Sequence, residues 1–271
     1  MAGKIRTSLL FFLLLLATFV IIALLYAVKN SVINSTPDTN VINIQEESKT
    51  YEAVSVNEES LFYKIEGSYP QFYEGSVEFN KEIEGLITQV ISEFKDESEG
   101  NYKAMREISP GDYPSEYPQT PFPFEVSFDV VYEGEDYISV LLRAGGYIGG
   151  AHGYHNIYSF NFDKTNRKDV SLEDIFGPGT DFAQFLSDYT REKLISKFTE
   201  LTQLQGGIPP IDSIEFGTEP VASNFNIFTF DSKNIYIHFP EYAVAAYAYG
   251  EQVVEIPKTD IQEALTGNTY R

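Results

Sequence analysis

The most hydrophobic part of the chain is the run from Leu9 to Val28, in which fifteen of the twenty residues are Leu, Ile, Phe or Val. Twenty helical residues span roughly 30 Å, the thickness of the hydrocarbon core of a bilayer. Two basic residues precede the run, whereas no acidic residue appears before Asp38, and this charge bias favours a cytoplasmic N-terminus. The pattern predicts a cytoplasmic stub at residues 1–8 and a transmembrane signal anchor at residues 9–28.

A cleaved signal peptide is the alternative interpretation of this run. Its apolar core would be shorter, about 7–15 residues, and would end in small residues. The anchor predicts a single-pass protein of the cell membrane, with everything after Val28 on the extracytoplasmic side. Residues 29–50, rich in Asn, Ser, Thr and acidic residues, are expected to form a polar linker.

Beyond the linker, two kinds of hydrophobic periodicity alternate along the chain. Apolar residues at steps of three and four predict amphipathic helices, one from Phe79 to Phe94 and one from Phe182 to Leu201. Ser171 followed by Asp174 is typical of a helix cap that opens a shorter helix. Alternation at every second residue predicts strands, which lie at residues 51–65, 122–130, 137–143, 158–162, 225–230, 235–239 and 252–256.

These elements define the expected fold class and its division into domains. Hairpins combined with long helices indicate an α+β fold, with antiparallel sheets and helices packed on one face. The glycines within residues 145–150 mark the expected boundary. We therefore expect a first α+β domain at residues 51–146, a second at residues 147–260 and a tail at residues 261–271.

Composition narrows the possible functions. The 271 residues include 19 Lys and Arg, 40 Asp and Glu and no Cys, for a formal net charge of −21. A disulfide scaffold, a Cys-based zinc site and a thiol catalyst are thereby excluded, and nucleic acid is not an expected partner. Lys4 and Arg6 precede Val28, so the exported part keeps 17 basic and 40 acidic residues and a net charge of −23. That acidity favours a cationic partner, or serves solubility alone.

The segment that looks most like a site is a glycine-rich loop containing Gly149, Gly150, His152 and His155. Two His three residues apart on a helix would suit metal ligation, but the surrounding glycines argue against a helix. The loop is therefore either a tight turn in which His152 bonds the backbone or a loop that binds a ligand or partner. We expect no metal site and no cofactor.

A second candidate is the aromatic segment with Tyr242, Tyr247 and Tyr249 among small residues. Tyr is favoured at binding surfaces because it combines a rigid apolar ring with a polar tip. Core packing is the alternative fate for these rings. Together with the glycine-rich loop, the three tyrosines form our set of candidate partner- or ligand-binding residues.

Several segments resemble the RsiV-like ectodomain family of extracytoplasmic proteins. The stretch from Tyr69 to Phe72, followed by Phe79 to Ile83, looks like the PdaC-type domain that often precedes it. The resemblance covers roughly residues 51–260. The segments that carry the RsiV-like part are Tyr147–Gly153, Tyr158–Asp163, Val170–Phe176 and Ile235–Ala243.

The resemblance implies tandem domains outside the bacterial membrane. In one architecture of the family, an anti-sigma factor, the ectodomain binds lysozyme, a strongly basic protein. In another, the tandem precedes the catalytic domain of a peptidoglycan deacetylase. Eight residues precede Leu9 and fifteen follow Ile256, so we expect neither a sigma-binding segment nor a deacetylase domain, and we assign no catalytic residues.

Three functional hypotheses follow. The first is a non-enzymatic, membrane-anchored extracytoplasmic binding module for a cationic protein such as lysozyme. The second is a module that binds cell-wall glycan (peptidoglycan) through exposed Tyr and the glycine-rich loop. The third is an uncharacterised hydrolase, which would need His152, His155 and carboxylates around one concave site.

Overall fold

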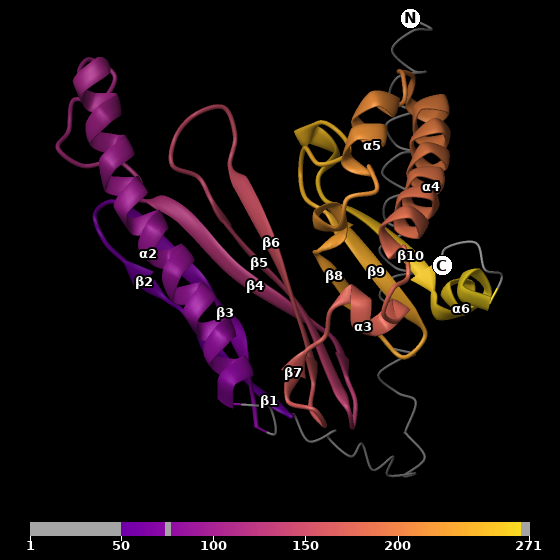
Figure 1. The fold of residues 1–271 in the computed structure, drawn as a ribbon. Helices are drawn as coiled ribbons and strands as arrows, with labels where there is room; N and C mark the ends of the chain where they lie inside the picture. Colours follow the sequence, from indigo (N-terminus) through magenta and orange to yellow (C-terminus); the bar gives the residue numbers. More distant parts are fainter. Residues whose placement is uncertain (1–49, 74–76, 267–271) are drawn as a thin grey trace, which may run out of the picture. The chain divides into compact units, whose positions relative to one another are not determined.

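Two β-sheets organise the residues that the computed structural model describes, 50–73 and 77–266. The larger sheet has the strand order β1-β3-β4-β5-β6-β7, with β2 also paired to β3, and the smaller has the order β10-β9-β8 (Figure 1). The strands are β1 (Tyr51–Ser55), β2 (Glu58–Glu59), β3 (Tyr63–Phe72), β4 (Phe122–Glu133), β5 (Tyr137–Gly146), β6 (Tyr154–Asp163), β7 (Lys168–Asp169), β8 (Phe228–Phe230), β9 (Asn234–Phe239) and β10 (Gln252–Pro257).

The fold is α+β, as predicted, but the larger sheet is mixed rather than antiparallel. β3 and β4 run parallel, with Tyr63 beside Phe122 and Gly67 beside Val126. Parallel neighbours need a long crossover connection, and helix α2 (Val77–Ile108) provides it. The helix is also longer than the periodicity from Phe79 to Phe94 predicts.

β3 continues beyond residue 65, where the sequence predicts the strand to end. From Ser68 to Phe72, a stretch that contains Pro70, the strand pairs with β1. β4 accompanies β3 only as far as Gly67, so the second half of β3 has a neighbour on one side. Proline is tolerated at such an edge because no ladder bond needs its missing N–H.

One face of the larger sheet packs against α2 (Figure 1). Alternate residues of β5, among them Ile138, Val140 and Leu142, are fully buried in this core together with Phe79 and Ile83 of the helix. The period-two alternation of the strands therefore matches the apolar stripe of the helix, as the sequence predicts.

The opposite face of the same strands holds the edge of the smaller sheet. The Phe228 N–H donates to Ser159 Oγ at 3.1 Å, and Asn161 Nδ2 donates to the Phe228 carbonyl at 2.8 Å. The Phe230 N–H donates to Ser139 Oγ at 3.0 Å, and this hydroxyl donates to Asn161 Oδ1 at 2.7 Å. We call Ser139, Ser159 and Asn161 with β8 the polar junction.

The expected domain boundary between residues 146 and 147 falls inside the larger sheet. β6 pairs with β5 over its whole length, so the larger sheet runs past residues 146 and 147. The described residues all fall within one compact unit. The division at residues 146 and 147 therefore does not coincide with the end of a sheet.

The described part of the chain has five α-helices, and four of them belong to the second half: α3 (Leu172–Phe176), α4 (Phe182–Gln205), α5 (Ile211–Gly217) and α6 (Lys258–Thr266). Ser171 and Asp174 cap each other's backbone at the start of α3, which confirms the capping box. α5 and the short 3-10 helix η1 (Ala222–Phe225) follow the predicted helix that ends at Leu201, in a stretch where no helix is predicted. Leu186, Leu194 and Phe198 of α4 are buried in the same core as β8 to β10.

No helix among the described residues is long and apolar enough to cross a membrane. The predicted signal anchor at residues 9–28 and most of the predicted linker lie outside those residues.

Candidate functional site

The glycine-rich loop and the segment that follows β9 meet in space, although about ninety residues separate them. The Tyr242 hydroxyl and His152 Nε2 are 3.0 Å apart. The ring of Tyr247 stacks on His152, with ring centres 3.9 Å apart and planes inclined by 21°. We call His152, Tyr242 and Tyr247 the aromatic cluster, and all three are among the candidate residues that the sequence indicated.

Hydrogen bonding defines the orientation of the His152 ring. Its Nδ1 lies 2.7 Å from the Gly153 carbonyl oxygen, which only accepts, so Nδ1 carries the hydrogen. In the neutral ring, Nε2 is then free to accept the bond from the Tyr242 hydroxyl. The turn interpretation and the binding interpretation of His152 are therefore compatible, because one nitrogen serves the turn and the other holds Tyr242.

The backbone of Tyr242 adopts an unusual conformation. Its φ is 68°, in the left-handed region that residues with a side chain rarely adopt. The residue nevertheless remains 60% exposed. Strained residues of this kind concentrate at binding and active sites, where surrounding contacts hold them in place.

His155 and Tyr249, the other candidate side chains, have partners outside the cluster. His155 Nδ1 is 3.3 Å from Glu241 Oε1, and the ring of Tyr249 packs edge-on against Phe198 at 5.1 Å. His152 and His155 therefore have different partners and do not form the joint His and carboxylate site that the hydrolase hypothesis requires.

Gly149 and Gly150 shape the loop through their backbones. Both have positive φ, 98° and 102°, which favours glycine. A Cβ at Gly149 would also lie 2.9 Å from Met105 of α2. The Tyr147 hydroxyl donates to the Gly150 carbonyl at 2.9 Å, and this bond closes the turn.

A cavity of about 470 Å³ adjoins the aromatic cluster, since Tyr242 is also one of its walls. Phe216 lines the same cavity and is 73% exposed. Asn224 and Asn226 add amide groups to the lining. The cavity thus combines exposed aromatic rings with amide groups and, at Glu219, one carboxylate.

A partly buried polar network, which the sequence does not indicate, lies between the two sheets, with His238 and Thr229 buried and Asp129 largely exposed. Arg143 Nη1 is 2.6 Å from Asp129 Oδ2, and its Nε is 3.1 Å from Glu251 Oε2. His238 Nδ1 lies 2.8 Å from Glu251 Oε1 and its Nε2 lies 2.9 Å from Thr229 Oγ1. The only available signal was a His between Ile237 and Phe239 in a strand that is otherwise apolar.

The balance of charge in this network decides the ionisation of Glu251. Burial alone would raise the pKa of this carboxyl, but the hydrogen bond from His238 and the charge of Arg143 lower it overall. Arg143 keeps its charge for the same reason, because Asp129 and Glu251 raise its pKa against the effect of burial.

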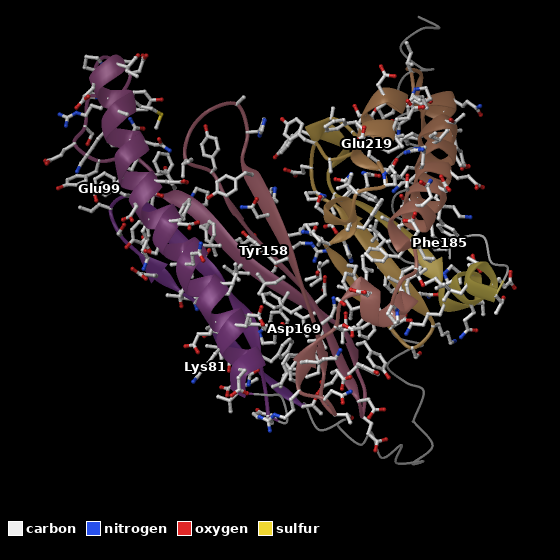
Figure 2. All side chains as sticks on the ribbon, viewed as in Figure 1. Lys81, Glu99, Tyr158, Asp169, Phe185 and Glu219 are labelled. Carbon is white, nitrogen blue, oxygen red and sulfur yellow. The ribbon has the colours of Figure 1, made fainter. Side chains whose placement is uncertain are left out.

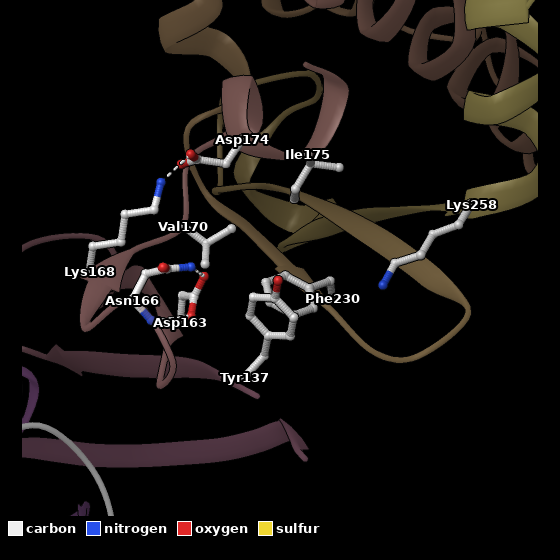
Figure 3. Close-up of a pocket in the computed structure, with 9 residues that line it drawn as sticks. All are labelled: Tyr137, Asp163, Asn166, Lys168, Val170, Asp174, Ile175, Phe230 and Lys258. Atoms are coloured by element: carbon white, nitrogen blue, oxygen red, sulfur yellow. Dashed lines mark hydrogen bonds and ion pairs between the residues drawn. The ribbon is translucent and has the colours of Figure 1, made fainter. Parts of the chain in front are cut away.

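A second cavity, of about 460 Å³, lies beside β7 and the start of α6 (Figure 3). Lys168 pairs with Asp174 at its rim, and the hydrogen bonds from Lys168 and Ser171 lower the pKa of Asp174 to about 2. Lys258 donates to the Asp231 carbonyl at 2.6 Å and lies 5.2 Å from the centre of the Phe230 ring. Burial lowers the pKa of Lys258. These interactions occupy both lysines within the protein.

Within residues 50–73 and 77–266, no three His, Asp or Glu side chains gather in a way that suits a metal ion.

Comparison with known proteins places this site in a tandem of two domains. Residues 56–155 match the family described as deacetylase PdaC, and residues 173–259 match the family of unknown function DUF3298. The chain therefore carries PdaC and DUF3298 domains in tandem, which confirms the resemblance to the PdaC and RsiV-like proteins. The aromatic cluster joins the two, with His152 in the first match and Tyr242 and Tyr247 in the second.

A curated relative and two solved structures are similar to the chain. Peptidoglycan-N-acetylmuramic acid deacetylase PdaC of Bacillus subtilis (strain 168) is 28% identical over 140 residues, which is 52% of this chain and 28% of that protein. The match thus spans less than a third of the relative's length. A DUF3298 protein from Bacteroides fragilis is 16% identical with a TM-score of 0.56, covering 78% of this chain and 91% of the other. One from Pseudomonas aeruginosa is 14% identical with a TM-score of 0.49, covering 78% and 92%. The Bacteroides structure supports the α+β fold.

Proposed function

We propose that this chain is a non-enzymatic, extracytoplasmic binding module of the bacterial cell envelope, held at the membrane through residues 9–28. Its partner is a cationic protein, and lysozyme is the concrete candidate. The tandem of PdaC and DUF3298 domains supports a role in the cell wall, and the resemblance to lysozyme-binding RsiV supports the partner. The deacetylase activity named for the relative is not assigned to this chain.

The observation that carries the proposal is the conformation of Tyr242. An exposed ring on a left-handed backbone residue, held by His152 and flanked by Tyr247, is already in place before a partner arrives. Pre-organised aromatic side chains are typical of the residues that dominate binding energy at protein interfaces.

Charge supports the same class of partner. The part of the chain after Val28 has a net charge of −23, so it attracts a basic protein over distances comparable to the Debye length. Such attraction raises the rate of association and weakens as salt is added.

Calorimetry with the full chain in a nonionic detergent tests the proposal. We expect lysozyme to bind at low salt and the affinity to fall roughly tenfold at physiological salt. Cytochrome c, a basic protein unrelated to the cell wall, is the control for attraction by charge alone. Lysozyme binding that is absent at both salt concentrations, or no stronger than that of cytochrome c, would rule out this partner.

The cavity beside Tyr242 favours a second candidate, a cell-wall glycan. Aromatic rings such as Phe216 and Tyr242 stack on the apolar faces of sugars, and the amides of Asn224 and Asn226 suit hydroxyl groups. We expect the chain to be retained on insoluble peptidoglycan and Phe216→Ala with Tyr242→Ala to release it. Retention that persists in the double variant would exclude this site for the glycan.

A further inference from the structure

β6 has an edge that no described strand covers over most of its length. β5 pairs with every residue of β6 on one side. On the other side, β7 pairs only with Phe162 and Asp163, and one further bond runs from the Val170 N–H to the Asn161 carbonyl. An unpaired strand edge is a ready template for another extended chain.

The direction of the free backbone groups follows from that last bond. Successive residues of an antiparallel strand direct their N–H and C=O groups to alternate sides. Because the Asn161 carbonyl points away from β5, the backbone groups of Ser159, Ile157 and His155 point the same way. The open stretch from Tyr154 to Phe160 is roughly 20 Å long, enough for a short extended segment.

The open edge lies in a groove. A cavity of about 580 Å³ is lined by Ile157 to Phe160 of β6, by Glu82, Leu86 and Gln89 of α2, and by Asn226 and Ile227. A smaller one, of about 100 Å³, continues along Tyr154, Asn156 and Tyr158 beside Glu93 and Glu97 of α2. Tyr158 lines both cavities and lies on β6 next to the helix (Figure 2).

The walls of this groove are acidic. Glu82, Glu93 and Glu97 contribute three carboxylates, and neither cavity has a Lys, Arg or His in its lining. Burial, with Glu97 and Glu93 nearby, raises the pKa of the Tyr154 phenol to about 12. Burial and the nearby Asp169 also raise the pKa of Glu82. Both shifts have the sign expected for a region of negative potential.

We propose that the open edge of β6, from His155 to Ser159, binds an extended basic segment of a partner protein as an additional strand of the larger sheet. The side chains of such a strand point alternately to its two faces, so every second residue meets α2 and its carboxylates. The added strand continues the line of β7. This inference rests on the proposed function in one respect only, namely that the partner protein is positively charged.

Charge also argues against a second copy of the chain as the occupant. Two copies paired through β6 would bring two sets of Glu82, Glu93 and Glu97 together, and like charges at short range are unfavourable. Strand addition supplies main-chain hydrogen bonds for affinity and uses side-chain pockets for specificity, which is the combination this groove offers.

The test uses a blocked peptide of alternating Lys and Thr added to the full chain in nonionic detergent. We expect binding that slows hydrogen exchange at least tenfold at the amides of His155, Ile157 and Ser159. The amides of Asn156 and Tyr158 already face β5 and serve as internal controls. The same peptide with N-methyl groups on alternate amides keeps its charge but cannot pair, so we expect it not to protect the edge.

Charge variants complete the test. Glu93→Gln with Glu97→Gln is expected to weaken peptide binding roughly three- to tenfold. Glu84→Gln with Asp96→Asn removes the same charge from exposed positions of α2 that line neither cavity, and we expect less than a twofold change.

Absence of peptide binding, equal binding of the N-methylated peptide, or binding without protection at the edge would each overturn the proposal. Protection that rises with protein concentration without peptide would overturn it in favour of a second copy. If the peptide does not bind while lysozyme still does, only the strand-docking proposal is excluded. If lysozyme does not bind while the peptide pairs with the edge, the proposal for the groove holds and lysozyme is excluded as the partner.

Discussion

Two of the contacts that join the PdaC-type and DUF3298-type halves of the described chain, the polar junction and the aromatic cluster, differ in kind. The polar junction is buried: Ser139 is 0% and Asn161 6% exposed, and its side chains satisfy backbone groups of the edge strand β8. The aromatic cluster is exposed and is held by ring stacking and one hydrogen bond to Tyr242.

The two contacts contribute differently to stability and to binding. A buried backbone group that loses its partner costs about 1–3 kcal/mol, so the polar junction stabilises the fold. Exposed rings add little to the free energy of unfolding, because water replaces much of the contact that these rings lose when the chain unfolds. The aromatic cluster is therefore free to serve a partner, and the following variants test this division in order of expected effect on the free energy of unfolding.

The largest effect is expected for Asn161→Ala in the polar junction. The substitution leaves the Phe228 carbonyl without its donor and removes the acceptor of the Ser139 hydroxyl. We expect a loss of about 2–4 kcal/mol in urea denaturation. Asn226→Ala, at an exposed position, is the matched control and should change stability by less than about 0.5 kcal/mol. Equal losses in the two variants would show that burial does not decide the contribution.

Glu251→Gln is expected to cost about 2 kcal/mol near neutral pH, because His238 and Arg143 lose a charged partner between the sheets. The folded pKa of Glu251 lies below its ordinary value of 4.5, so its contribution is present above that pH. It is lost as the pH falls through the folded pKa. Denaturation midpoints between pH 6 and pH 3 should therefore fall less steeply in the variant than in the original chain. An unchanged slope would contradict this role for Glu251.

Ser171→Ala measures a purely local contact, against which the two inter-half contacts can be judged. The Ser171 side chain accepts the Asp174 N–H at 3.2 Å in the capping box of α3. We expect a loss of about 1 kcal/mol, with Ser171→Asp retaining most of the stability. A loss as large as that of Asn161→Ala would mean that α3 contributes to the junction itself.

The smallest effect on stability, less than about 0.5 kcal/mol, is expected for Tyr242→Ala, since the ring is mostly exposed and the substitution removes little buried area. The same variant should weaken lysozyme binding at least tenfold if the aromatic cluster is the binding surface. Tyr73→Ala removes a tyrosine that is 66% exposed and is expected to leave binding unchanged within twofold. Equal binding by both variants would separate lysozyme from the cluster.

Much of the fold could be predicted from the sequence. The alternation in β4 and β6, the apolar stripe of α2 and the capping box of Ser171 and Asp174 are local patterns, and each was found as predicted. Local patterns report the environment of one segment. They do not report which strand lies next to which, so the parallel pairing of β3 with β4 and the continuation of β3 through Pro70 were missed.

The candidate site shows the same limit. The sequence determined by itself that His152, Tyr242 and Tyr247 were of interest, because unusual residue types cluster in short segments. The sequence also determined the net charge, and it is the basis of the predicted anchor at residues 9–28. Only the tertiary structure decided that these three rings touch, that His155 and Tyr249 have other partners, and that β6 keeps an open edge beside Glu93 and Glu97. The reason is that contacts between residues ninety positions apart depend on the path of the whole chain, which no local pattern encodes.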